Sequence, residues 1–69
     1  MHGSLTWTPY RIVLRGRLGE HVVAGFDGIE LETRPGETVI TGAFDQARLH
    51  GLLDRMRDLG IELVSVNPA

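Results

Sequence analysis

The most regular pattern in the sequence lies between residues 45 and 60, and it predicts one amphipathic helix. Five apolar residues recur there at positions i, i+3, i+4, i+7 and i+10, which place side chains on one face of an α-helix. These residues are Leu49, Leu52, Leu53, Met56 and Leu59. Asp45 is of a type preferred at a helix N-cap, and Gly60 is of the type that most often follows a helix C-terminus. We therefore expect the helix to lie between these two residues.

Four segments with strand patterns surround this helix. The first two alternate apolar and polar side chains, and the last two are rich in β-branched residues, as half-buried β-strands are. They cover residues 10–17, 28–33, 37–42 and 61–66. Pro35 and Gly36 suit the two central positions of a type II turn. The second and third segments are therefore expected to form a hairpin.

A shorter helical pattern lies between the first two strands. Leu18, Val22 and Phe26 share one helical face, although glycines at both ends weaken the pattern. The order strand, short helix, strand, strand, helix, strand predicts an α+β protein of the ferredoxin-like split βαβ type. Such a fold has a four-stranded antiparallel sheet with both helices on one face. Residues 1–8 show no periodicity and are expected to be a flexible lead-in to a single domain of residues 9–69.

Size and composition predict that the chain does not act alone. A core of 69 residues without cysteine has neither disulfides nor a thiolate metal site to support it, and oligomerisation is the common remedy. We therefore expect a homodimer. A net charge of −2 does not favour binding to nucleic acid or anionic membranes. The N-terminus lacks a signal-peptide pattern and no apolar run reaches the roughly 18 residues of a membrane span, so a cytoplasmic location is expected.

Residues that carry chemistry are sparse. His50 and Asp54 are neighbours at i and i+4 on the predicted helix, but no nucleophile motif accompanies them. His21 and His50 lack the spacing of metal ligands. We therefore expect no catalytic residues, no metal and no cofactor, and a role as a non-catalytic interaction or regulatory module. A small dimeric enzyme that uses His50, His21 and Tyr10 remains an alternative.

Two groups of residues are candidate sites. A loop of Gly16, Arg17, Leu18 and Gly19 offers backbone N–H groups and a guanidinium, which together can hold an anion such as a carboxylate. The last predicted strand carries a single charge and has the features of an edge that pairs with another chain. The candidate dimer interface comprises Val13, Glu62, Val64, Val66 and, on the helix, Gly51.

Most of the chain resembles a family of short uncharacterised proteins common in actinobacteria. The resemblance lies in residues 10–18, in Thr41-Gly42 and in residues 45–66. Its specific part is the segment from Asp45-Gln46 through residues 49–53 (Leu-His-Gly-Leu-Leu) to Leu59-Gly60. No activity follows from it. The expected topology is also similar to that of ACT regulatory domains, which are small dimeric modules that often bind amino acids. That resemblance implies a ligand at the loop of residues 16–19, close to a dimer contact, and makes a carboxylate sensor the alternative function.

Overall fold

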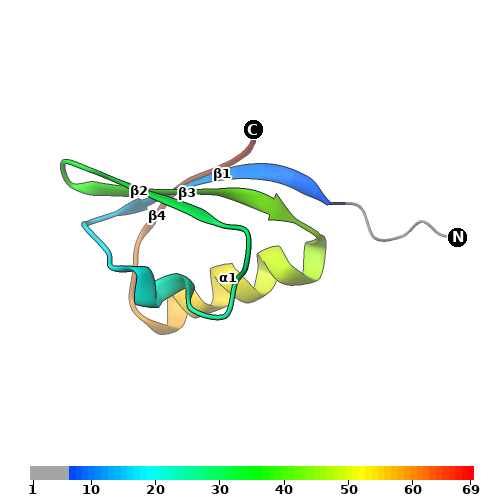
Figure 1. Ribbon diagram of the computed structural model, residues 1–69. Coiled ribbons are helices and arrows are strands. Elements are labelled where there is room, and N and C mark those ends of the chain that lie inside the picture. Colours follow the sequence, from blue (N-terminus) through cyan, green and yellow to red (C-terminus); the bar gives the residue numbers. More distant parts are fainter. Residues whose placement is uncertain (1–6) are drawn as a thin grey trace, which may run out of the picture.

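The computed structural model describes residues 7–69, which form four strands, one α-helix and one short 3₁₀ helix (Figure 1). The elements are β1 (Thr8–Arg15), the 3₁₀ helix η1 (Glu20–Val23), β2 (Glu30–Arg34), β3 (Glu37–Phe44), α1 (Gln46–Asp58) and β4 (Leu63–Pro68). The strands form one sheet in the order β2-β3-β1-β4, and all neighbours are antiparallel. This confirms the predicted fold class, with β1 in the interior of the sheet beside β4.

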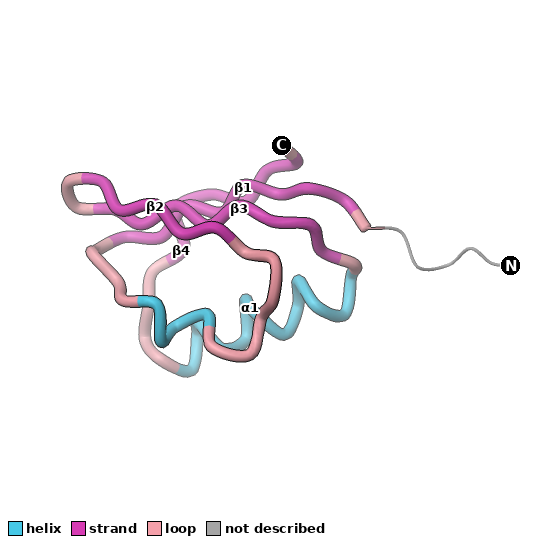
Figure 2. The backbone as a smooth tube through the Cα atoms, in the orientation of Figure 1, coloured by secondary structure: helices cyan, strands magenta, loops and turns pink. Residues whose placement is uncertain are grey.

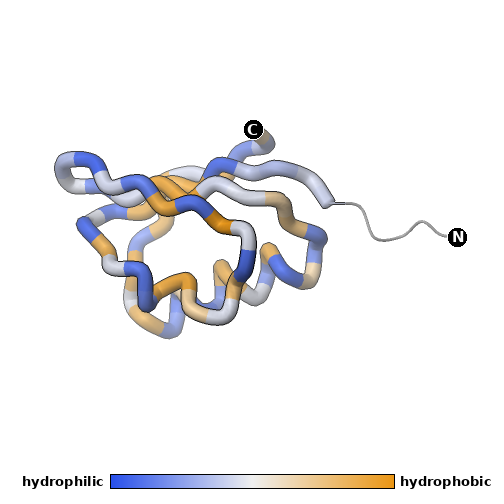
Figure 3. Tube along the Cα trace, in the orientation of Figure 1, coloured by the Kyte–Doolittle hydropathy of each residue, from blue (hydrophilic) through white to orange (hydrophobic). Residues whose placement is uncertain are grey.

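The core lies between the sheet and α1. Both helical elements lie on the same side of the sheet (Figure 2). Hydrophobic residues lie in the middle of the strands, and hydrophobic and hydrophilic residues alternate along α1 (Figure 3). Ile12 and Leu14 of β1 and Ile40 of β3 are 0% exposed, and Leu52 of α1 is equally buried. The buried side chains of β1 and the apolar face of α1 thus pack against each other in one layer. This agrees with the sequence, because alternate residues of a strand, and residues three or four apart on a helix, lie on the same side.

The local signals at turns and helix ends have the expected geometry. The Asp45 carboxylate accepts a hydrogen bond from the backbone N–H of Arg48 at 2.7 Å, so Asp45 is the N-cap of α1. Gly60 follows the helix with φ +74°, the left-handed conformation that glycine adopts without strain. Gly36 has φ +72° between the paired residues Arg34 and Glu37, as the second central position of a type II turn requires.

The expected helix of residues 18–26 is reduced to η1, a single 3₁₀ turn of four residues. Only Val22 of this turn is fully buried. Glycines at positions 19 and 25 flank the turn, and a helical nucleus this short fixes several residues for few hydrogen bonds. The prediction of a helical segment here is correct in position but wrong in extent.

Strand ends also differ from the expected ones. Thr8 is the first residue of β1, so it belongs to the sheet and not to a lead-in, whereas residues 1–6 of that expected lead-in lie outside the described residues. β4 begins at Leu63, two residues later than expected, and includes Pro68. Proline is tolerated there because β4 lies at the edge of the sheet, where a missing N–H costs no interior hydrogen bond.

Two arginines of α1 hold the segment that follows η1. The Arg48 guanidinium donates to the carbonyl of Asp27 and lies 5.6 Å from the ring centroids of Trp7 and Phe26 and 5.7 Å from that of Phe44. Arg55 donates to the carbonyl of Ala24 and lies 5.5 Å from the centroid of Phe26. Hydrogen bonds and cation–π contacts therefore fasten residues 24–27 to α1 where a longer helix was expected.

Candidate functional site

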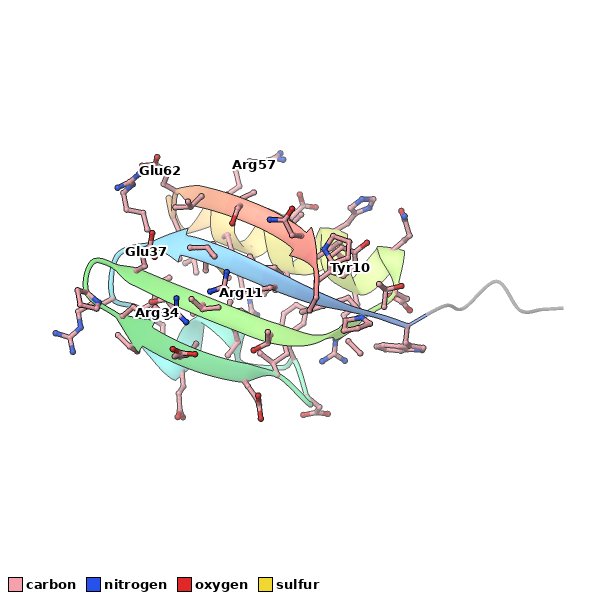
Figure 4. All side chains as sticks on the ribbon, turned by 90° about the horizontal axis from the view of Figure 1, so that it is seen from above. Tyr10, Arg11, Arg34, Glu37, Arg57 and Glu62 are labelled. Carbon is pink, nitrogen blue, oxygen red and sulfur yellow. The ribbon has the colours of Figure 1, made fainter. Side chains whose placement is uncertain are left out.

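The sheet face opposite α1 is not an apolar docking surface. Val13 and Val39 are paired at its centre and are 6% and 3% exposed. The residues around them on this face are largely charged; they include Arg11, Arg15, Glu32, Arg34 and Glu37, three of which are labelled in Figure 4. Long charged side chains cover apolar neighbours with their hydrocarbon stems. Val13, a candidate interface residue, therefore has little surface left to contribute to an interface.

The edge formed by β4 is apolar and exposed. β4 pairs with β1, and no strand within residues 7–69 pairs with its other side. Leu63 and Val64 are 44% and 43% exposed. Leu63 lies opposite Leu14 and Ser65 lies opposite Val13, so Val64 is an extra residue at a bulge. Two large apolar side chains thus lie next to each other on a strand that has one unpaired edge.

A hollow of about 260 Å³ adjoins this edge on the helix side of the sheet. Leu53, Met56 and Arg57 of α1 line it together with Ile61 and Leu63. Leu59, at the end of α1, is 54% exposed. We refer to Leu59, Ile61, Leu63, Val64 and this hollow as the β4 surface.

Charges of both signs surround the β4 surface. Glu62 pairs with Arg15 at 3.1 Å, and Asp54 pairs with Arg57 at 3.9 Å, all four side chains being well exposed. Figure 4 shows Arg57 and Glu62 on the β4 side of the molecule. Exposed pairs of this kind add little to stability, so these groups remain available to a partner.

The backbone of β4 limits how a partner strand can pair with it. The N–H of Ala69 donates to the carbonyl of Pro9 at 2.8 Å. Because residues of an antiparallel ladder alternate in direction, Asn67 and Ser65 also face β1, and Val66 between them directs its N–H and C=O outward. Pro68 has no N–H to offer. Val66 is therefore the residue around which an added strand can pair.

The predicted anion loop is held by the chain itself. The N–H of Leu18 donates to Oγ1 of Thr38 at 2.9 Å, Thr38 donates to the carbonyl of Gly16 at 2.8 Å, and the N–H of Gly16 donates to the carbonyl of Gly36 at 2.7 Å. Thr38 is 0% exposed. Two of the four loop N–H groups, those of Gly16 and Leu18, therefore already have partners within the chain.

The end of this loop lies next to a carboxylate. Gly19 is the N-cap of η1, whose first turn carries the carboxylate of Glu20. A negative charge at that position opposes a second one. The Glu20 carboxylate therefore disfavours an anion at the N-terminus of η1.

Arg17, in contrast, lines a hollow of about 310 Å³ with Thr33, Arg34 and Pro35. We call this the arginine hollow. It lies where the segment after β1 meets the turn between β2 and β3, at the same end of the sheet in Figure 1. Sequence reasoning identified Arg17 but not Arg34, because only the hairpin register brings the two arginines together.

The remaining candidates do not form a reactive group. His50 and Asp54 are both exposed, and Asp54 pairs with Arg57 and makes no hydrogen bond to His50. Tyr10 packs its ring against Phe44, with centroids 6.4 Å apart. Gly51 is exposed with open space beside it. In the part of the chain from Trp7 onward, no three His, Cys, Asp or Glu residues gather as metal ligands would.

Comparisons with known proteins give one match. A family model described as a domain of unknown function (DUF8691) matches residues 9–67, which extend from β1 into β4. No curated protein and no solved structure matches the chain. Within residues 7–69, no helix has the length and apolarity needed to cross a bilayer.

Proposed function

The chain belongs to the DUF8691 family of domains of unknown function, and from this premise we propose that it is a non-catalytic interaction module that pairs with a second copy of itself through the β4 surface. The observation that carries the proposal is the exposure of Leu63 and Val64 on an unpaired edge strand. Edge strands of soluble proteins usually carry charges or prolines that prevent pairing. In β4 only the end of the strand is protected in this way, by Pro68.

The hollow supports a side-chain contribution to this pairing. It lies directly beside the edge and is lined mainly by Leu53, Met56, Ile61 and Leu63. Pairing about Val66 places Ala69 of a second copy opposite Leu63, next to this hollow, because the sum of paired residue numbers is constant in an antiparallel ladder. Backbone pairing and apolar burial then act at the same place.

A second copy fits this surface in two respects. Antiparallel pairing about Val66 is symmetric, so each copy meets the same residues of the other, as a two-fold interface requires. It places Val64 of each copy opposite Pro68 of the other, since the sum of paired residue numbers is constant in an antiparallel ladder. The surrounding charges include Asp54 and Arg57, so each copy presents both signs to its partner.

The test is the molar mass in solution, measured by analytical ultracentrifugation on the wild-type chain and on Val64→Lys. We expect the wild type to sediment as two chains at micromolar concentration. Val64→Lys should sediment as one chain, because it places a charge inside the paired surface. Thr33→Lys makes the same charge change on β2, at the opposite edge of the sheet, and should remain dimeric.

Two results would contradict the proposal. A wild-type mass of one chain at micromolar concentration would exclude self-association. If the wild type and Val64→Lys are both dimeric and Thr33→Lys is monomeric, the interface lies at the β2 edge instead. Circular dichroism of each variant establishes that it is folded.

A further inference from the structure

We propose that self-association brings the α1 helices of the two copies into contact at Leu53, so that the interface has a second layer beneath the paired β4 strands. This contact rests on the self-association proposed above. It extends the interface from the edge of the sheet to one side of α1, and it fixes how the two copies are arranged.

The paired strands alone offer little to hold two chains together. Val66 and its counterpart can exchange a pair of hydrogen bonds, but the flanking pair of Val64 with Pro68 lacks one donor, because Pro68 has no N–H. An intermolecular hydrogen bond replaces bonds to water and contributes little, whereas association costs both chains their independent motion. A stable dimer therefore needs apolar side chains that are buried beneath or beside the ladder.

The side of α1 next to β4 is in position to supply an apolar side chain. Leu53 is partly buried and lines the hollow together with Leu63 of β4. His50 and Arg57 are three and four positions away from Leu53, so they lie on the same side of α1, and both are exposed. In Figure 4, which looks onto the sheet, Arg57 reaches past β4. An apolar residue between polar ones is typical of the centre and rim of an interface.

The two-fold axis of the paired strands passes level with the middle of α1. The helix comes soon after the end of β3, which pairs with Thr8 at the start of β1. It precedes the start of β4, which pairs with Leu14 near the end of β1. The helix therefore extends along most of β1. Val66, at the axis, pairs with Ile12, which is between these two ends. Leu53, near the middle of α1, therefore lies close to the axis in both copies.

The spacing and twist of the strands bring the two helices together. Figure 4 shows α1 beneath β1 and β4. A helix beneath the boundary of these strands lies two strand spacings, or about 10 Å, from its counterpart in the paired sheet. Helices in contact are about 8–10 Å apart. Two steps of sheet twist rotate one helix by about −45° relative to the other, close to the commonest crossing angle of about −50°. Helices that cross in this way touch near one point, which is close to Leu53.

Disulfide formation in single-cysteine variants tests this contact, because the chain has no cysteine of its own. Facing Cα atoms on helices about 10 Å apart are about 5 Å from each other, which a disulfide can span. We expect Leu53→Cys, oxidised with copper phenanthroline, to give a covalent dimer on a non-reducing gel. Gly51→Cys is the matched control, because residue 51 is exposed on the opposite side of α1. Cysteines held together react at a millimolar effective concentration, so Leu53→Cys should cross-link roughly a hundredfold faster than Gly51→Cys.

The molar mass of the reduced variants separates this contact from the pairing of β4. If Leu53→Cys sediments as two chains but does not cross-link, the helices do not meet, and pairing through β4 stands. If the wild type sediments as one chain, both proposals fail. Equal rates for Leu53→Cys and Gly51→Cys would also overturn the contact. In the double variant Leu53→Cys, Val64→Lys the rate should fall to that of Gly51→Cys, and an undiminished rate would show that the helices do not meet through β4 pairing.

Discussion

Thr38 shows how one residue organises a site that it does not touch. It is 0% exposed, and its hydroxyl both accepts from the N–H of Leu18 and donates to the carbonyl of Gly16. A buried polar group that lacks partners is costly, whereas one that satisfies two backbone groups orders them. Thr38 therefore fixes the backbone on both sides of Arg17.

Replacement of Thr38 by valine should destabilise the protein. Valine keeps the branched shape but removes both hydrogen bonds, which leaves the N–H of Leu18 and the carbonyl of Gly16 without their partner. We expect a loss of about 1–3 kcal/mol in the free energy of unfolding, measured by urea denaturation. Thr41→Val is the control, because Thr41 lies on the same strand and its side chain makes no hydrogen bond within residues 7–69. Equal losses in the two variants would contradict this role.

Residues with local signals could be predicted from the sequence, and residues that act over long range could not. Asp45 caps α1, and Gly36 adopts its turn conformation, through interactions within three or four positions. Arg34 joins Arg17 through the hairpin, and Arg48 reaches Asp27 across 21 positions. No spacing rule connects residues so far apart, so the arginine hollow could not have been located in full.

At the scale of elements, a clamped segment replaces the expected first helix. Between Ala24 and Asp27 the chain has few hydrogen bonds of its own, and Arg48 and Arg55 supply donors and stacking from α1. The predominance of arginine over lysine suits this arrangement, because a planar guanidinium stacks on rings while it donates. The apolar spacing of residues 18–26 predicted where this segment packs. It could not predict that Arg48 and Arg55 of α1 hold the segment in place.

Replacement of Arg48 should make residues 24–27 less firmly held against α1. In Arg48→Met the hydrogen bond to Asp27 and the cation–π contacts are lost, although the apolar stem remains. We expect a stability loss of about 1–2 kcal/mol and faster amide hydrogen exchange in residues 20–29, measured by mass spectrometry. Arg57→Met is the control, because the side chain of Arg57 is 82% exposed. Unchanged exchange in Arg48→Met would show that the clamp does not hold the segment.

Replacement of the glycine inside α1 should stabilise the protein, whereas the replacements of Thr38 and Arg48 should destabilise it. Gly51 has open space beside it and an ordinary helical backbone. Glycine costs about 1 kcal/mol relative to alanine in a helix interior. Gly51→Ala should therefore raise the free energy of unfolding by about that amount, as measured by urea denaturation. An unchanged or lower stability, or a changed molar mass, would indicate that a second chain contacts α1 at this position.

At the scale of the whole molecule, strand order and the apolar edge at β4 could be predicted, but the character of the open sheet face could not. Two strands connected by a hairpin, with one strand before them and a helix and a strand after them, can form few antiparallel sheets. The observed order β2-β3-β1-β4 is the one that the ferredoxin-like connection of these elements predicts. The burial of Val13 under its neighbours depends on side chains from three strands at once. Within residues 7–69, the β4 edge is therefore an apolar surface and the open face is not.

Self-association through β4 should couple stability to concentration. If two folded chains bind each other and unfolded chains do not, mass action stabilises the folded form as concentration rises. We expect the urea midpoint of the wild type to increase between micromolar and submillimolar protein. Val64→Lys should show no such increase. A wild-type midpoint independent of concentration, in a sample that sediments as a dimer, would indicate that association does not stabilise the fold.

The position of β1 between β3 and β4 has a consequence for synthesis. β1 is made first, but its neighbour β4 begins only at Leu63. At about 10 residues per second, a ribosome needs about 5 s to add the intervening residues. Until β4 is made, the side of β1 that it covers in the folded sheet has no strand to pair with, even after β3 is in place.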